Sequence, residues 1–259
     1  IKQGGSMSIF LVLFFMGLVQ GLTEFLPVSS SGHLVLISKL FNMEESLFLS
    51  ILLHVATLFS IVVVFWKDIW ELIRHPFSKK TVMLMVATIP TCLIVLVLMP
   101  IIKSSFGGAL LPFCFLFSAL LLFVTEFLTK KKTTHELNYK TAFIMGIAQG
   151  FAVFPGISRS GTTICAGLLA GGDKKESAKF SFLMSIPIII LSMVMEIYEI
   201  CQGSVTINYP VIAIIASFLV AFLSGIFAIK FMMKLTEKGN LKWFSLYLLI
   251  IGIVTFFII

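Results

Sequence analysis

Charged residues are scarce in this sequence. Of its 259 residues, 12% are Asp, Glu, Lys or Arg and 59% are hydrophobic, whereas a soluble domain usually carries roughly one quarter charged residues. Apolar runs close to the ~20 residues that span a bilayer recur along the whole length and leave no stretch for a soluble domain. We therefore predict a single all-α, polytopic transmembrane domain over residues 7–259.

Cysteine motifs are also missing, because the four cysteines lie in or beside apolar runs without CxxC or CxxH spacing. The net charge of +7 comes from Lys and Arg clusters between apolar runs, as the positive-inside rule predicts, so we expect no nucleic-acid partner. Residues 1–6 read IKQGGS and resemble a tag remnant, which places the expected native start at Met7. A cleaved signal peptide is not expected, since the first apolar run contains Gln20 and Glu24.

Six apolar runs are long enough to cross a membrane: residues 47–66, 81–101, 109–129, 180–200, 209–233 and 242–259. Two further regions, residues 9–41 and 141–170, are apolar at both ends but interrupted by Pro, Gly, Ser and a charge. We interpret each of these as two short helices that form a re-entrant hairpin.

The connecting segments predict the orientation. Most of the Lys and Arg residues lie in four segments that we place in the cytoplasm, residues 67–80, 130–140, 173–179 and 230–242. Three links that carry a single Lys between them are expected outside, residues 42–46, 100–108 and 201–208. With six crossings, this distribution requires the first hairpin to enter from outside and the second from inside.

The two broken regions resemble each other in sequence. Gly17, Gln20, Gly21, Phe25, Pro27, Ser29, Ser31 and Gly32 correspond to Gly146, Gln149, Gly150, Phe154, Pro155, Ser158, Ser160 and Gly161. Each half contains one hairpin and three crossings, and because three is odd the second half is inverted relative to the first. The sequence therefore predicts an inverted-topology repeat over about residues 7–129 and 141–259.

Both hairpin tips carry Ser and Gly directly before a helical apolar run, at residues 27–33 and 155–163. Irregular backbone at membrane depth has to be buried in protein or line a wet cavity, so we expect the tips to meet in one site. Ser and Gly at a helix start expose backbone N–H groups, and the positive end of the helix dipole points the same way. The pattern predicts an anion site.

Arg159 narrows the anion to a phosphate or carboxylate, because its planar fork donates two parallel hydrogen bonds; the alternative is a structural ion pair with Glu24. Gln20 and Glu24 share one helix face and can hold a hard divalent cation through oxygen, or Glu24 can act as a base. The second copy has Gln149 but Val153 in place of Glu24, so the site is predicted to be asymmetric.

His33 can transfer a proton or only join two helices by a hydrogen bond. Three adjacent serines are candidate nucleophiles as well as phosphate donors, and spacing does not distinguish among Ser29, Ser30 and Ser31. Outside the motifs, we expect His54 to pack against a neighbouring helix rather than line the cavity, and Glu196 to reach water near the end of its span.

These residues give the sequence a family resemblance. QGLTEFLPVSSSGH (residues 20–33) and PGISRSGTT (residues 155–163) resemble the (E/Q)xxxE, Ser-rich and PGxSRSxxT motifs of the bacterial undecaprenyl-diphosphate phosphatase family associated with bacitracin resistance. The predicted six crossings and two inverted hairpins, which cover essentially the whole chain from Met7, are similar to the family's fold. Gln stands at position 20, which the motif permits but which weakens any mechanism that needs two carboxylates there.

The resemblance implies hydrolysis of undecaprenyl diphosphate to the monophosphate carrier lipid, with phosphate released at the outer face of the bacterial plasma membrane. It implies a divalent metal, Mg²⁺ or Ca²⁺, with metal binding or base catalysis by Gln20 and Glu24. Ser29 and Ser30 would bind or attack the substrate, and His33 would transfer a proton. The diphosphate would be held by Ser158, Arg159, Ser160 and Thr163.

The rival prediction is a transporter for a phosphate-bearing anion or lipid, since inverted repeats with broken helices also occur in secondary transporters. The acid and base groups gathered on the first hairpin favour a hydrolase. The sequence leaves open which cation is preferred and whether the attack is covalent or direct. It also leaves open the oligomeric state, and a homodimer is compatible with it.

Overall fold

The computed structural model describes residues 6–41, 47–129, 135–203, 209–238 and 241–259, and its regular elements in these ranges are helices. The first half forms α1 (Ser6–Phe25), α2 (Ser30–Leu40), α3 (Leu47–Val64), α4 (Trp66–Arg74), α5 (Lys79–Ser105) and α6 (Leu111–Thr129). The second half forms α7 (Tyr139–Phe151), α8 (Arg159–Leu169), α9 (Lys174–Gln202), α10 (Val211–Lys238) and α11 (Lys242–Ile258). Several predicted segments lie wholly or partly outside the described residues: the tag remnant, two outer links and two cytoplasmic loops, at 1–5, 42–46, 204–208, 130–134 and 239–240.

Each predicted crossing corresponds to one helix whose ends lie within about two turns of the predicted boundaries. Among the described helices, four (α5, α6, α9 and α10) are long and apolar enough to cross a membrane, and α3 with α4 would make a fifth. α11 is a shorter apolar helix. The prediction of an all-helical, multi-pass membrane protein is therefore confirmed, whereas six crossings with two re-entrant hairpins stay a prediction.

Residues 67–80, predicted to be a loop, contain most of helix α4 in the structure. α4 is bent by 82° from α3. Its apolar side chains recur at helical spacing, at Trp66, Ile69, Trp70 and Ile73, a signal that the charges between them obscure. Lys179 of α9 forms an ion pair with Asp68 (Nζ to Oδ1, 2.6 Å), which joins α4 to α9.

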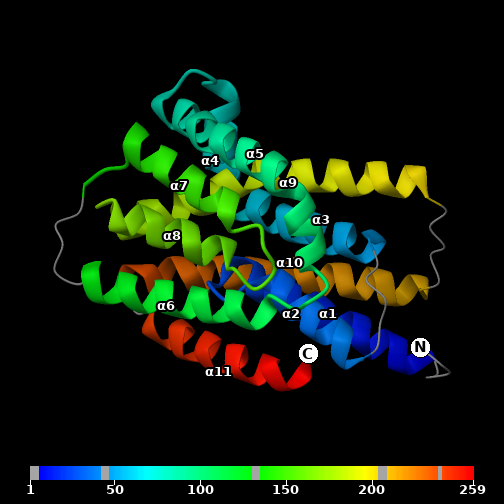
Figure 1. The fold of residues 1–259 in the computed structure, drawn as a ribbon. Coiled ribbons are helices and arrows are strands. Elements are labelled where there is room, and N and C mark those ends of the chain that lie inside the picture. Colours follow the sequence, from blue (N-terminus) through cyan, green and yellow to red (C-terminus); the bar gives the residue numbers. More distant parts are fainter. Residues whose placement is uncertain (1–5, 42–46, 130–134, 204–208, 239–240) are drawn as a thin grey trace.

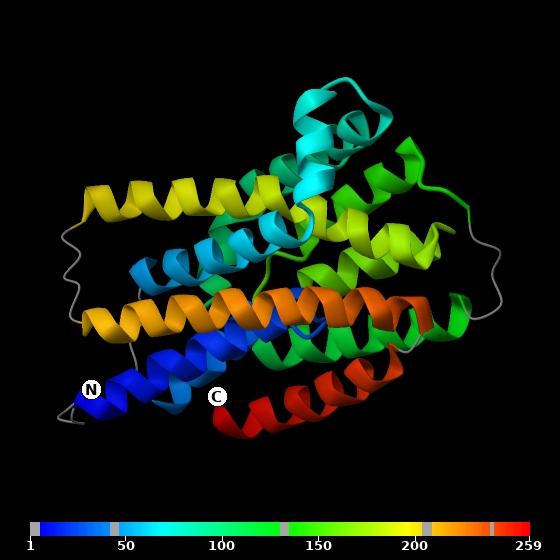
Figure 2. The same ribbon diagram turned by 180° about the vertical axis from the view of Figure 1, so that it is seen from behind.

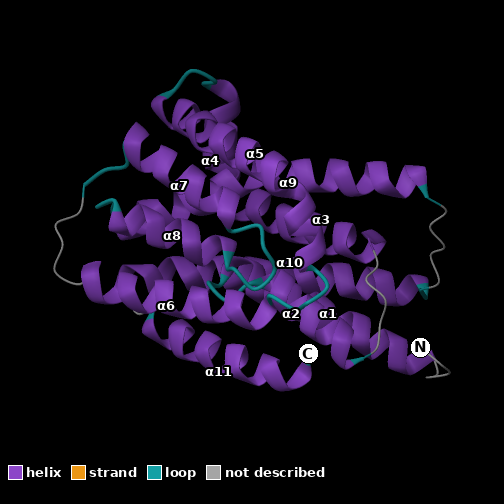
Figure 3. Ribbon diagram, viewed as in Figure 1, coloured by secondary structure: helices purple, strands orange, loops and turns teal. Residues whose placement is uncertain are grey.

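Both broken regions are helix pairs joined by an irregular turn, as predicted, although α1, with 20 residues, is longer than the short helix that we expected. α1 and α2 enter the molecule from one end, α7 and α8 enter from the opposite end, and the two turns meet near its centre (Figure 1, Figure 2). Figure 3 shows these turns as loop segments surrounded by helices. The two helix pairs thus place irregular backbone in the interior, where neighbouring protein groups can satisfy it.

Glycines of the repeat bring each hairpin against a long helix of the other half. A Cβ atom added to Gly17 would lie 2.3 Å from the carbonyl oxygen of Ser217 on α10. One added to Gly146 would lie 2.2 Å from the carbonyl oxygen of Ala87 on α5. Gly17 and Gly146 hold equivalent positions in the two copies, so one sequence signal produces both close helix contacts. The two halves therefore interlock.

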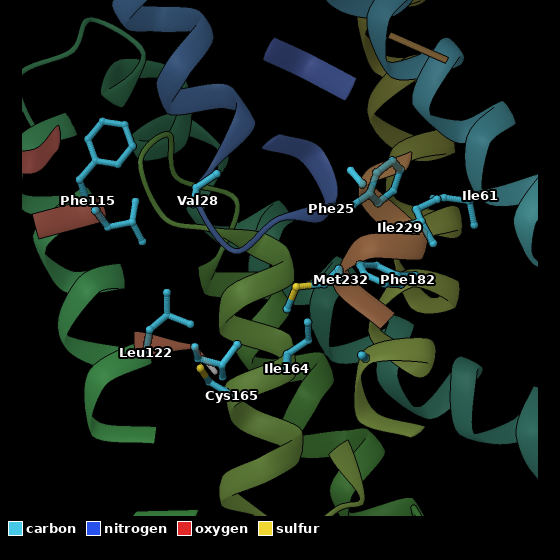
Figure 4. Close-up of a cluster of buried hydrophobic side chains, with 14 of the residues drawn as sticks. Phe25, Val28, Ile61, Phe115, Leu122, Ile164, Cys165, Phe182, Ile229 and Met232 are labelled. Atoms are coloured by element: carbon cyan, nitrogen blue, oxygen red, sulfur yellow. The ribbon is translucent and has the colours of Figure 1, made fainter. Parts of the chain in front are cut away.

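The main hydrophobic cluster packs around the first turn (Figure 4). Phe25, at the end of α1, contacts Phe182 of α9 edge to face, with ring centroids 5.7 Å apart. Phe115 and Leu122 of α6 are also buried in this cluster. Because lipid is as apolar as these side chains, their close packing stabilises the fold mainly through van der Waals contact. The cluster gives the turn a rigid support.

Candidate active site

The first turn contacts the second through Ser29. This residue caps α2, and its Oγ accepts hydrogen bonds from the backbone N–H of Gly32 (3.3 Å) and, across the two hairpins, of Gly156 (3.0 Å). Its φ of 68° lies in the left-handed region, where a residue other than glycine is strained. A second bond between the tips runs from Ser160 Oγ to the Leu26 carbonyl (2.9 Å). The structure thus brings the two motifs into direct contact.

Glu24 is the centre of this contact. Its side chain is 1% exposed, and Oε2 accepts hydrogen bonds from Gln20 Nε2 (3.0 Å) and from Ser30 Oγ (2.5 Å). Oε1 forms an ion pair with Arg159 Nη2 of the second hairpin, and the Arg159 side chain is 19% exposed. The ion pair that the sequence offered as an alternative role for Arg159 is therefore formed. It joins the two copies of the hairpin motif, of which only the first has the carboxylate.

A cavity of about 210 Å³ opens beside this ion pair. Its polar wall comes from both tips and contains Glu24, Ser29, Ser30, Ser31, Ser158, Arg159 and Ser160. Its apolar wall is formed largely by α2, α3 and α9, with residues such as Leu34, Leu53 and Ile188. A polar end beside an apolar wall suits a ligand that has a charged head and a hydrocarbon tail.

Two helix N-termini meet at this cavity. Ser158 caps α8 as Ser29 caps α2: its Oγ accepts a hydrogen bond from Gly161 N–H (3.1 Å), and its own N–H donates to Ser118 Oγ (3.1 Å). The positive ends of both helix dipoles and the Arg159 guanidinium therefore point to one place. This arrangement can bind an anion of the phosphate type.

Three predicted site residues stand behind the cavity wall. Gln20 and Thr163 are completely buried, and the Thr163 hydroxyl is hydrogen-bonded to Ser181 Oγ on α9 (2.6 Å). His33 packs between Phe115 and Tyr247. None of the three lines the cavity. Their predicted substrate contact and proton transfer stay predictions.

Comparison with known proteins places this site in a family. The family model of bacitracin resistance protein BacA matches residues 13–254. The chain belongs to the BacA family. Relatives named undecaprenyl-diphosphatase include those of Carboxydothermus hydrogenoformans (38% identical over 242 residues, 92% of this chain and 93% of the relative) and Thermosipho africanus (40% over 250 residues, 94% and 98%). A third, from Parabacteroides distasonis, is 39% identical over 251 residues, 93% of this chain and 94% of its own length.

The resemblance that the two motifs indicated is thereby confirmed. In this BacA family member the cavity also contains polar residues outside the motifs. Ser50 Oγ donates a hydrogen bond to Glu196 Oε1 (3.0 Å), and His54 Nδ1 donates one to the Ser50 carbonyl (2.8 Å). All three residues line the wall, so the expectation that His54 avoids the cavity is wrong, and Glu196 faces this cavity. A carboxylate within an apolar helix was the available signal.

Gln20 and Glu24 offer this BacA family member the hard oxygen donors that Mg²⁺ and Ca²⁺ prefer. Gln20 Oε1 is buried without a hydrogen-bond partner, beside the Glu24 carboxylate. Across the described part of the chain, no three His, Cys, Asp or Glu side chains gather as a metal cluster. The pair would supply two oxygen donors, and a cation held there would need its remaining oxygens from a substrate and water.

Proposed function

We propose that this BacA family protein hydrolyses undecaprenyl diphosphate to undecaprenyl phosphate and inorganic phosphate, which recycles the carrier lipid of cell-wall synthesis. The names of its relatives support this activity. One observation carries the proposal: Ser30, Glu24 and Arg159 meet in a cavity between two helix N-termini. They supply a nucleophile, a base and an anion-binding cation, the set that phosphoryl transfer needs.

The reaction begins with competition for Arg159. A diphosphate in the cavity takes the guanidinium from Glu24, while the N–H groups of both helix starts bind its oxygens. Glu24 is then free to take the proton that Ser30 Oγ donates to it in a hydrogen bond. Ser30 Oγ bonds to the terminal phosphorus as the anhydride P–O bond breaks and undecaprenyl phosphate leaves. Water then cleaves the serine phosphate, and Ser30 regains its proton.

A divalent cation completes this proposal. Gln20 and Glu24 would hold Mg²⁺ or Ca²⁺, which when bound would neutralise charge on the diphosphate oxygens. Ser29 has a different part, because both of its hydroxyl contacts are backbone N–H groups and it holds the tips together. Ser31 and Ser158 line the cavity as further hydroxyl donors to the diphosphate, and Ser160 lines it while its own proton is donated to the Leu26 carbonyl.

The proposed topology has six crossings, two re-entrant hairpins and an inverted repeat, in the bacterial plasma membrane. The cavity opens toward the outer face in this arrangement. Its far wall includes Ser50 near the start of α3, Phe106 just after α5 and Glu196 near the end of α9. Each of these lies close to a link with few positive charges, which supports an outer position for the opening.

The decisive experiment measures phosphate release from undecaprenyl diphosphate by purified protein in detergent. Ser30→Ala, Glu24→Ala and Arg159→Ala should each lower kcat at least roughly 100-fold, because each removes a group that acts on the reacting phosphate. Ser104→Ala is the matched control, since this exposed serine bonds only its own helix. Full activity in Glu24→Ala or Arg159→Ala would refute the assignment.

Acid quenching of a single turnover with ³²P-labelled substrate distinguishes the two forms of attack. A phosphoserine at Ser30 supports covalent catalysis, and its absence at full turnover supports direct attack by water. Counterflow of labelled phosphate or phospholipid in liposomes, with no hydrolysis, would instead favour a transporter.

A further inference from the structure

Tyr247 of α11 contacts the active-site hairpin at His33, and neither residue lines the cavity. Its hydroxyl lies 2.6 Å from His33 Nε2, and the two rings are stacked with an interplanar angle of 5°. The ring is 39% exposed on the outer surface of α11. A tyrosine hydroxyl in an apolar environment needs a partner, and His33 supplies it.

The other nitrogen of His33 defines the tautomer. Nδ1 lies 2.7 Å from the Ser29 carbonyl oxygen. A carbonyl only accepts hydrogen bonds, so Nδ1 carries the proton and, in the neutral ring, Nε2 accepts from the Tyr247 hydroxyl. Tyr247, His33 and the Ser29 carbonyl therefore form one directed chain of hydrogen bonds.

This chain ends on the strained residue of the site. Ser29 has a φ of 68°, and such a conformation persists only where its surroundings hold it. Its Oγ is fixed by the N–H groups of Gly32 and Gly156, and its carbonyl by His33. Ser30 follows directly, with its hydroxyl on Glu24. The direction of the Ser30 hydroxyl therefore depends on how firmly the Ser29 peptide is held.

We propose that Tyr247 is a positioning residue for phosphoryl transfer. It fixes the His33 ring, which fixes the Ser29 carbonyl and with it the Ser30 hydroxyl against Glu24. This inference rests on the proposed diphosphatase function. It gives α11, which contributes no residue to the cavity wall, an effect on the rate of the reaction.

Tyr247→Phe tests the inference, because it removes the hydroxyl and keeps the stacked ring. We expect kcat to fall about fivefold to tenfold, the effect of one net hydrogen bond, with KM unchanged because Arg159 and the α8 N-terminus have no contact with Tyr247. Tyr198→Phe, at an exposed tyrosine of α9, is the matched control and should keep the wild-type kcat.

A spectroscopic measurement separates positioning from a general loss of structure. With ¹⁵N-labelled histidine, and with His33→Gln to assign the signal, the wild-type protein should show one Nδ1-protonated tautomer of His33. Tyr247→Phe should shift the Nε2 signal, while Tyr198→Phe should not. An unchanged kcat or an unchanged His33 signal in Tyr247→Phe would overturn the inference. The histidine spectrum does not need turnover, so the two readouts are independent. A wild-type protein that releases no phosphate would refute the proposed function, whereas the His33 signal tests the Tyr247 contact.

Discussion

Removing the charge of Glu24 should have opposite effects on anion binding and on catalysis, because Glu24 pairs with Arg159 and also acts as the proposed base. In Glu24→Gln the side chain keeps its shape and hydrogen-bonding ability but loses its charge, so the Arg159 guanidinium is left without its ion-pair partner. Breaking a buried pair from one side usually costs 3–5 kcal/mol, and the 19% exposure of Arg159 places the expected loss of unfolding free energy near the lower figure, about 3 kcal/mol. The variant should therefore be less stable than the wild type in the absence of an anion.

An anion should recover part of this loss. The wild-type protein has to break the ion pair before a diphosphate can reach Arg159, whereas Glu24→Gln does not. We expect pyrophosphate to bind Glu24→Gln about tenfold more tightly, a difference of about 1.4 kcal/mol, in calorimetric titrations with EDTA present. Phosphate release should nevertheless be lost, because the base is gone.

A control variant and the addition of Mg²⁺ show whether these effects come from the Glu24–Arg159 ion pair. Glu199→Gln breaks the exposed ion pair between Glu199 (side chain 38% exposed) and Lys103 (60% exposed). This control should change neither stability nor pyrophosphate affinity appreciably. With Mg²⁺ in place of EDTA the gain in affinity should shrink, because Glu24 is then a proposed metal ligand. Weaker pyrophosphate binding by Glu24→Gln in EDTA would contradict the competition between Glu24 and the substrate.

Three further changes test other parts of the site. Gly32→Ala would place a Cβ 2.9 Å from the Gly156 backbone nitrogen, so we expect it to separate the hairpin tips and lower phosphate release more than tenfold. Gly107→Ala is the control, because the nearest atom to its added Cβ lies at 3.4 Å, and it should not change phosphate release. Glu196→Gln removes a negative charge from the cavity wall and should raise kcat/KM about twofold to fivefold at low salt, with the gain disappearing in high salt. EDTA should abolish phosphate release, and Mg²⁺ or Ca²⁺ should restore it; undiminished activity in EDTA would contradict the metal proposal.

The repeat made the interior of the molecule predictable. The matching Gly, Gln and Ser positions indicated two broken helices whose tips meet, and the structure has Ser29 bonded to Gly156 and Glu24 paired with Arg159. A carboxylate and a guanidinium in apolar surroundings need each other, which is why the sequence offered the pair as the alternative to a ligand role for Arg159.

Contacts with helices outside the repeat motif were not predictable in the same way. Tyr247, Ser50 and Glu196 lie on three different helices, and only their tertiary arrangement directs them to His33 or to the cavity. The motif implies Thr163 as a diphosphate ligand. In the structure its hydroxyl is hydrogen-bonded to Ser181 of α9, a contact that the sequence did not indicate, and the ligand role stays a prediction. Helix α4 escaped prediction because its charges resemble those of a loop.

The close contact of α1 with α10 has a consequence for biogenesis. α1 is synthesised long before α10, and Glu24 long before Arg159. A carboxylate that enters a bilayer alone costs roughly 2.5–3.5 kcal/mol on insertion scales. We therefore expect the first hairpin to reach its final depth only after the second half has been made, so that a nascent chain cannot hydrolyse lipid before its insertion is nearly complete.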